Sequence, residues 1–205
     1  MAGSRKTWRR DEIVAAAAHC FMQQGYHATR IDDVAAHLGC TKGRIYHYWP
    51  TKTDLFFDVH RAGMARLFAA VDPLPDGPNG AAQLAGLLHA HARAMLDHHT
   101  YETVVAQGVQ VHRFNRLSDV QQQVMSDLIA SRDRFETLFL QALMRGMADG
   151  SLACENPSIT VKVLLGGLQW SIIWYRPQQG ETEQDRADLA AQMVHPLLHG
   201  VKKHD

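Results

Sequence analysis

A short polar and basic run, Thr41-Lys-Gly-Arg-Ile-Tyr-His47, has the composition to bind phosphate groups and base edges. Its lysine and arginine present cationic N–H donors, and its threonine, tyrosine and histidine add further hydrogen-bonding groups. Gly43 removes a side chain where a ligand must come close. Lys52, shortly after the run, adds a further cation near the start of another expected helix. The chemistry indicated is recognition of a nucleic acid.

The elements that must position this run are two short helices separated by a glycine. Apolar residues recur at three and four along residues 31–48, which is the helical spacing. Gly39 stands between the two helices, where a tight turn needs positive φ. Such a pair forms a helix-turn-helix if its second helix can lie in a major groove. The residues expected to face inward are Ile31, Val34, Ala35, Leu38, Ile45 and Tyr48.

Capping residues predict where several helices begin and end. A first helix is expected from Arg9 to Gln24, ending at Gly25. Thr29-x-x-Asp32 and Thr51-x-x-Asp54 both have the spacing of a capping box. Three later signals are a Ser118 cap, the Asn156-Pro157 pair, and glycines at 150 and 200 that close helices.

No stretch shows the alternation of a strand, so the expected fold is all-α with about nine helices. The proline- and glycine-rich residues 73–80 break the chain, and longer helices follow. We expect a helix-turn-helix head over residues 1–54 and a larger helical body over residues 55–205. The helices expected in the body after the break are 81–97, 100–115, 119–149, 157–175 and 183–199.

Charge supports a nucleic-acid partner only weakly. The formal net charge of the chain is zero, but residues 1–53 hold eight Lys or Arg against four acids. A basic end on an acidic body fits an end that meets phosphates. The excess is modest, so the polar run carries more of the argument than the charge.

Several function classes are disfavoured by what the sequence lacks. It has no glycine-rich phosphate loop, nucleophile elbow or His-Glu-x-x-His run, so we expect no enzyme and no cofactor. His195 and His199 are four residues apart without a third ligand in suitable spacing, so we expect no metal. The three cysteines lie far apart, which favours a reducing cytoplasm. The apolar residues 159–174 are interrupted by polar ones, which favours a buried helix over a membrane span.

About fifty N-terminal residues resemble the DNA-binding domain of TetR-family transcriptional regulators. The segments that carry the resemblance are Phe21-Met-Gln-Gln-Gly-Tyr-His-Ala-Thr29, Ile31-Asp-Asp-Val-Ala35 and Thr41-Lys-Gly-Arg-Ile-Tyr-His-Tyr-Trp-Pro-Thr-Lys-Thr-Asp-Leu55. Departures from the family pattern are small: Arg30 for a second threonine, Val34 for isoleucine, Cys40 for valine and Trp49 for phenylalanine.

The resemblance implies a dimer that binds a palindromic double-stranded operator, and it implies roles for residues of the head. Lys42 and Arg44 are then the candidates for reading bases. The full set of candidate DNA contacts is Thr29, Thr41, Lys42, Gly43, Arg44, Tyr46, His47 and Lys52. Thr29 and Thr41 have an alternative as helix caps, and Tyr48 and Trp49 fit the core better than a contact.

The last two long helices are apolar enough to need a second partner besides their own core. Residues 161–174 are apolar almost all round, and residues 189–201 carry a wide apolar stripe. A two-fold dimer would supply that partner. The residues expected at its interface are Leu168, Ile172, Leu189, Met193, Val194, Leu197 and Leu198.

The segment Trp170-Ser-Ile-Ile-Trp-Tyr-Arg-Pro177 is similar to a signature of family members that regulate fatty-acid and steroid catabolism, several of which respond to acyl-CoA thioesters. Indoles can flank an acyl group and an arginine can pair with phosphate. The alternative is that the tryptophans are core and Arg176 complements a helix C-terminus. Candidate effector contacts are Gln107, Gln110, Arg113, Phe114, Trp170, Trp174 and Arg176.

The function expected from these patterns is a cytoplasmic repressor that releases its operator when a small effector, with an acyl-CoA as the candidate, binds the body. An activator, or a DNA-binding interaction module without ligand control, remains the alternative. A ligand-free body packed solid would favour that alternative.

Overall fold

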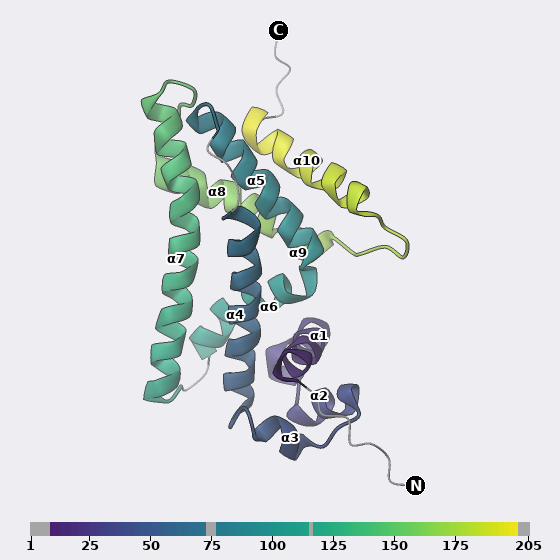
Figure 1. Cartoon of the computed structure of the whole chain (residues 1–205). Helices are drawn as coiled ribbons and strands as arrows, with labels where there is room; N and C mark the ends of the chain where they lie inside the picture. The colour runs from purple at the N-terminus through teal and green to yellow at the C-terminus, as the bar shows by residue number, and fades with distance from the viewer. Residues whose placement is uncertain (1–8, 73–76, 115–116, 201–205) are drawn as a thin grey trace. The chain divides into compact units, whose positions relative to one another are not determined.

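The computed structural model describes residues 9–72, 77–114 and 117–200, with residues 109–114 described by their backbone alone. Every regular element in these ranges is a helix, which confirms the all-α expectation (Figure 1). The described ranges contain ten helices: α1 (Arg10–Ala28), α2 (Ile31–Leu38), α3 (Lys42–Tyr46), α4 (Lys52–Val71), α5 (Gly80–Asp97), α6 (His99–Phe114), α7 (Asp119–Ala148), α8 (Pro157–Gln169), α9 (Ser171–Trp174) and α10 (Glu183–His199).

The helices divide into two compact units. The first unit takes Met1–Gly63 together with Thr100–Leu128, and the second takes Met64–His99 together with Ile129–Asp205. The boundaries fall inside α4, near the start of α6 and inside α7, so three helices contribute residues to both units. The functional division expected at residue 54 stays a prediction.

The core of the first unit joins α1 to the helices that follow it. Fully buried side chains come from α1 to the start of α4, and the largest are Trp49, Phe21, Phe56 and Phe57. Phe21 and Phe56 meet edge to face with ring centroids 5.4 Å apart. Burial of such aromatic side chains contributes most of the apolar stabilisation of a small unit. Apart from Tyr48, the residues that should face inward from α2 and α3 are buried as expected.

Glycine breaks α1 where the sequence predicts its end. Gly25 has φ +78° and ψ 161°, outside the helical region and costly for any residue with a Cβ. One further turn follows before Thr29. Gly39 has φ +64° and provides the expected turn between α2 and α3.

The predicted caps are found at most helix ends. Thr51 and Asp54 exchange hydrogen bonds at the start of α4, and Ser118 and Gln121 do so at the start of α7. The Asn156 side chain accepts from the Ile159 N–H at the start of α8. These bonds satisfy N–H groups that a helix leaves without partners.

Two local predictions are wrong. The capping box of α2 joins Arg30 and Asp33, whose carboxylate accepts from the Arg30 N–H at 2.7 Å, rather than Thr29 and Asp32. The reason is that the Thr29 hydroxyl is already used, since it donates to carbonyl groups of α1. Tyr48 is 44% exposed instead of facing inward, because Trp49 takes the buried position that follows α3.

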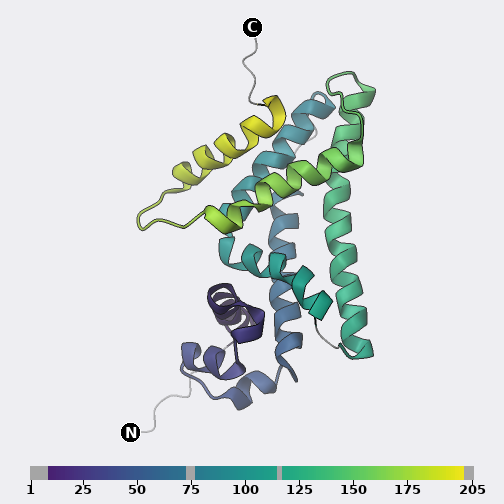
Figure 2. The ribbon, with the colours of Figure 1, turned by 180° about the vertical axis from the view of Figure 1, so that it is seen from behind.

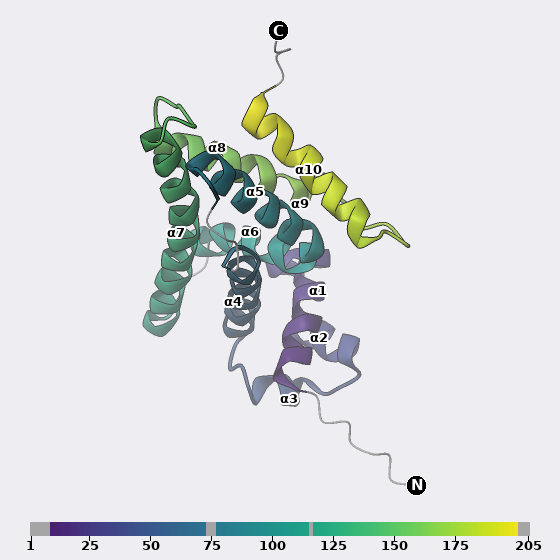
Figure 3. The same ribbon diagram turned by 45° about the horizontal axis from the view of Figure 1, so that its top comes forward.

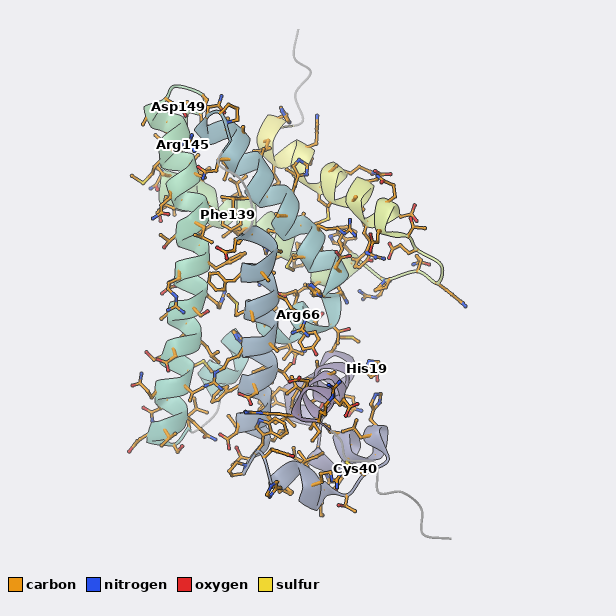
Figure 4. The ribbon with its side chains drawn as sticks, viewed as in Figure 1. His19, Cys40, Arg66, Phe139, Arg145 and Asp149 are labelled. Atoms are coloured by element: carbon orange, nitrogen blue, oxygen red, sulfur yellow. The ribbon has the colours of Figure 1, made fainter. Side chains whose placement is uncertain are left out.

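In the second unit, α5 contacts both α8 and α10 (Figure 3). Gly167 allows α10 to come close to α8, since a Cβ there would lie 2.9 Å from Leu197 Cδ2. The predicted helix 157–175 is broken at Trp170, and Figure 2 shows α8 and α9 following one another along α5. At the end of α7, Asp149 accepts from the Gly80 N–H at 2.7 Å and Arg145 donates to Gln83, which ties α7 to α5 (Figure 4).

Candidate functional site

The polar run identified in the sequence lies on the surface of α3 and its flanks. Thr41, Lys42, Gly43, Tyr46 and His47 are exposed. Arg44, between them, is half-buried. The turn before the run is fixed by the Cys40 N–H, which donates to the Ala35 carbonyl at 2.9 Å. A short helix with one buried face and one polar face is therefore held firmly against α2.

The electrostatic environment of this surface leaves its lysine available to anions. Lys42 lies 3.5 Å from Asp32, with both side chains about 60% exposed. Ion pairs this exposed contribute little and are easily exchanged for another partner. A phosphate group can therefore compete with Asp32 for Lys42.

Two residues predicted to contact phosphate have structural partners instead. Thr29 is fully buried, and its hydroxyl donates to the Gly25 carbonyl at 2.8 Å and to the Cys20 carbonyl at 3.2 Å. Lys52 Nζ donates to the carbonyls of Tyr26 (2.7 Å), Thr29 (2.9 Å) and His27 (3.2 Å). Burial lowers the pKa of Lys52, although Asp33 acts in the opposite direction. Both side chains therefore hold the end of α1, and their contact with DNA stays a prediction.

A network around Asp58 was missed by the sequence reasoning. The Trp49 Nε1–H donates to the Asp58 carboxylate at 2.7 Å, and Arg10 and Arg61 donate to the same carboxylate. Arg10 also lies over the Trp49 ring, 5.3 Å from its centroid. Burial raises the pKa of Asp58, but the three hydrogen bonds outweigh it and the pKa lies below its usual value. The available signal was Trp49 itself, because an indole that replaces phenylalanine brings an N–H that needs an acceptor.

The candidate effector residues do not form one group. Gln107 is bonded to α1, and the side chains of Gln110, Arg113 and Phe114 lie outside the part of the chain that the structure describes. Trp170 and Trp174 are 63% and 47% exposed. Arg176 is also exposed, and it donates to the Tyr175 carbonyl at 2.8 Å.

A pocket of about 390 Å³ opens elsewhere in the second unit, between α5, α7 and the end of α4. None of its residues was singled out in the sequence: Phe68, Val71, Asp72, Gln83, Leu87, Leu138, Gln141 and Ala142. Its volume lies in the range of small-molecule sites. The mixture of apolar side chains, two amides and one carboxylate gives no periodic sequence signal.

Residues expected at a dimer interface differ in their exposure. Leu168 and Val194 are fully buried within the second unit, whereas the other five are half-buried. A more exposed apolar set, which was not among the seven residues expected at the interface, lies in α8, at the break after it and in α9: Ile159, Val163, Trp170, Ile173 and Trp174, all 47–63% exposed. We call these five residues the α8–α9 apolar face. They follow the helical spacing, but the sequence alone does not show which side of an apolar helix its own core leaves uncovered.

The residues that the structure describes include no group of three or more His, Cys, Asp or Glu placed to hold a metal ion. His195 and His199 do lie together, with ring centroids 4.6 Å apart. Among the described helices, none has both the length and the apolar character needed to cross a membrane.

Comparison with known proteins gives matches over both parts of the chain. The family model described as "Bacterial regulatory proteins, tetR family" matches residues 13–59, and that described as "Tetracyclin repressor-like, C-terminal domain" matches residues 77–201. The HTH-type transcriptional repressor KstR2 of Mycolicibacterium smegmatis is 28% identical over 177 residues, which cover 85% of this chain and 82% of that protein.

Two solved structures share the fold. The TetR family regulator PfmR from Thermus thermophilus has a TM-score of 0.79 at 25% identity, covering 97% of this chain and all of that one. AibR in complex with isovaleryl coenzyme A and operator DNA has a TM-score of 0.69 at 20% identity, covering 91% of this chain and 97% of that one. The proteins that this chain resembles are regulators of transcription and not enzymes.

Proposed function

Because the chain belongs to the TetR family of transcriptional regulators, we propose that it is a cytoplasmic repressor that binds a palindromic operator as a dimer and releases it when a small molecule binds the body. The KstR2 relative, which is named a repressor and aligns with most of this chain, supports repression over activation.

The observation that carries the proposal is the exposed polar face of α3. Lys42, Tyr46 and His47 are exposed and carry hydrogen-bond donors, whereas Ile45 is fully buried. A recognition helix needs this division, since one face must be fixed in the head while the other reaches into the major groove. Lys42 and Arg44 would read bases, and Thr41, Tyr46 and His47 would contact phosphates.

The direct test is operator binding by Lys42→Ala and Arg44→Ala on duplexes that the wild-type protein selects from a random pool. We expect weaker binding by each variant, with loss of about 1–3 kcal/mol of base discrimination at any position that the residue reads. Arg134→Ala is the matched control, because Arg134 is an exposed cation of α7 in the second unit. Unchanged operator binding by both Lys42→Ala and Arg44→Ala at moderate salt would contradict the assignment of α3 as the recognition helix.

The candidate effector is an acyl-CoA thioester. The fold accommodates such a ligand in AibR, whose solved complex contains isovaleryl coenzyme A and operator DNA. In this chain Trp170, Trp174 and Arg176 remain the proposed contacts. The 390 Å³ pocket offers apolar walls for an acyl group, whereas Asp72 in its lining disfavours the phosphates of coenzyme A at that point.

Mass spectrometry of protein purified from cells under native conditions tests the effector class. A bound mass that matches an acyl-CoA, and release of the selected duplex by that compound but not by free coenzyme A, is the expected result. Operator binding that no co-purified or added thioester changes would remove this ligand class while leaving the repressor itself in place.

A further inference from the structure

The backbone between Gly25 and Thr29 is held by side chains from two other helices. We call it the 25–29 segment. Lys52 at the start of α4 donates to three of its carbonyl groups. Gln107 of α6 holds its first turn: the Tyr26 N–H donates to Gln107 Oε1 at 3.1 Å, and Gln107 Nε2 donates to the Phe21 carbonyl at 3.1 Å.

The two bonds of Gln107 join the chain on both sides of the Gly25 break. Phe21 precedes the break and Tyr26 follows it, so one amide bridges the two parts of α1. The orientation of the amide is set by its partners, because the N–H of Tyr26 needs an acceptor and the carbonyl of Phe21 needs a donor. A helix break needs such partners, since it interrupts the regular backbone ladder.

Helix α6 packs closely against α4 beside this amide. A Cβ on Gly108 would lie 2.8 Å from the His60 ring, and one on Gly63 would lie 2.5 Å from the side chain of Val105. These close contacts fix the register of α6 on α4 within the first unit. Lys52 and Gln107, one on each helix, are therefore held at a set spacing on the 25–29 segment.

The first residue of α6 has its contacts in the second unit. His99 Nε2 lies 3.4 Å from the Ile172 carbonyl, and the His99 ring meets that of Tyr175 edge to face with centroids 5.5 Å apart. Gln107 follows eight residues later, about 12 Å along the helix axis. One helix thus contacts the Trp-Tyr-Arg-Pro segment at its start and the α1 break two turns further on.

We propose that Gln107 is a positioning residue that transmits the placement of α6 to the α1 break, and thereby links the effector state of the body to the DNA-binding head. The proposal rests on the proposed function. When α6 moves relative to α4, Lys52 and Gln107 can no longer hold the 25–29 segment together, and the angle of α1 at Gly25 changes. Because α1 packs on α2 within the first unit, that angle sets where α2 and α3 lie.

The first experiment measures hydrogen exchange of the Tyr26 amide without DNA. In Gln107→Leu this exchange should rise about tenfold or more, because the amide loses its acceptor. Gln123→Ala is the matched control, since Gln123 is an exposed glutamine whose side chain donates within α7, to Asp127. An unchanged Tyr26 exchange rate in Gln107→Leu would overturn the proposal.

The second experiment measures coupling with the selected operator duplex as the probe. In the wild type, the duplex should slow exchange in α6 as well as in α2 and α3. In Gln107→Leu, protection of α2 and α3 should remain while the response of α6 is lost. A response of α6 that persists in the variant, or that is missing in the wild type, would overturn the coupling.

The two proposals fail in different ways. If the wild-type protein selects no duplex, the proposed function fails. Hydrogen exchange at the Tyr26 N–H still tests whether the Gln107 side chain holds the α1 break. Should Gln107→Leu not fold, Gln107→Glu serves in its place, because it keeps an acceptor for Tyr26 and replaces the donor to Phe21 by a carboxylate oxygen. It should then show a partial loss of the α6 response, and a full wild-type response would count against the inference.

Discussion

His91 is an ionisable side chain enclosed in the aromatic core of the second unit. Its ring centroid lies 5.2 Å from that of Phe135 and 5.8 Å from that of Phe139, and its Nδ1 is buried without a hydrogen-bond partner. Burial lowers the pKa of His91 to about 4. The folded protein therefore holds this ring neutral, whereas the unfolded chain protonates it near its ordinary pKa of 6.5.

The free energy of unfolding should depend on pH through His91. Above about pH 6.5 both states are neutral at this residue, so its effect is absent; between about 6.5 and 4 only the unfolded state takes up the proton, and stability falls. The loss is on the order of 3 kcal/mol near pH 4. Urea unfolding of the wild type and of His91→Phe at several pH values checks this. As pH falls, the free energy of unfolding should decrease more in the wild type than in His91→Phe. A difference between the two proteins that does not depend on pH would contradict this role of His91.

At the scale of the helix, the break in α1 depends on a local backbone conformation at Gly25 and on hydrogen bonds from Gln107, which is distant in the sequence. Gly25 and Gly150 both have φ +78°, and an added Cβ would meet nothing within 4 Å at either. They differ in surroundings, because Gly150 lies beside Asp149, which bonds to α5 in the second unit, while Gly25 lies between the two α1 partners of Gln107 in the first unit. Substitution at both glycines therefore distinguishes the effect of backbone strain, which they share, from an effect of the α1 break on DNA binding, which only Gly25 can have.

Gly25→Ala and Gly150→Ala should each lower the free energy of unfolding by about 1–3 kcal/mol, since both force an alanine into a backbone conformation with positive φ. Only Gly25→Ala should also weaken operator binding, because the strain falls where α1 turns toward α2. Thermal unfolding and duplex titration measure the two effects. Equal operator affinity in the two variants would show that the break does not position the head.

Helix ends could be predicted from the sequence where the capping partner lies within the same turn. Thr51 with Asp54, Ser118 with Gln121, and the Asn156-Pro157 pair are all of this kind. The prediction failed at Thr29, because its hydroxyl bonds to carbonyls of α1 that precede the cap.

The residues of the candidate site could likewise be predicted only where their contacts are local in the sequence. The exposed face of α3 follows from its spacing, and all residues predicted on it except Arg44 are exposed. The bonds of Lys52 and Gln107 join residues 23 to 86 positions apart, so no local pattern could reveal them. The α8–α9 apolar face was predictable as apolar, but its exposure depends on how α5 and α10 cover the opposite side.

For the whole molecule, we propose that a second copy covers the α8–α9 apolar face, so that Trp170 and Trp174 would take part in both the dimer and the effector site. Five large apolar side chains about half exposed on neighbouring helices are more than scattered surface residues, and such faces mark interfaces. Gly166 lies exposed in α8, and a Cβ there would meet nothing within 4 Å, so a partner helix can approach closely at this position. A two-fold pairing there would present two recognition helices to the two half-sites of an operator.

Val163→Glu should therefore shift the protein toward monomer and weaken operator binding, because a buried unpaired carboxylate opposes pairing. Ile129→Glu is the matched control, as Ile129 is a 40% exposed apolar residue of α7 outside this face. Sedimentation at several concentrations measures the assembly state. A Val163→Glu variant that stays dimeric like the control would place the interface elsewhere.

The division of the chain into interleaved units bears on how heads of new specificity could be transplanted. The first unit draws residues 100–128 from far downstream, including Gln107, which bonds to α1, and Gln121, which donates to Thr51 and Asp54. A chimera joined at one crossover near residue 54 would separate the head from both glutamines. A graft that carries residues 100–128 along with the N-terminal helices would keep these bonds, so exchange between relatives calls for a second transplanted segment.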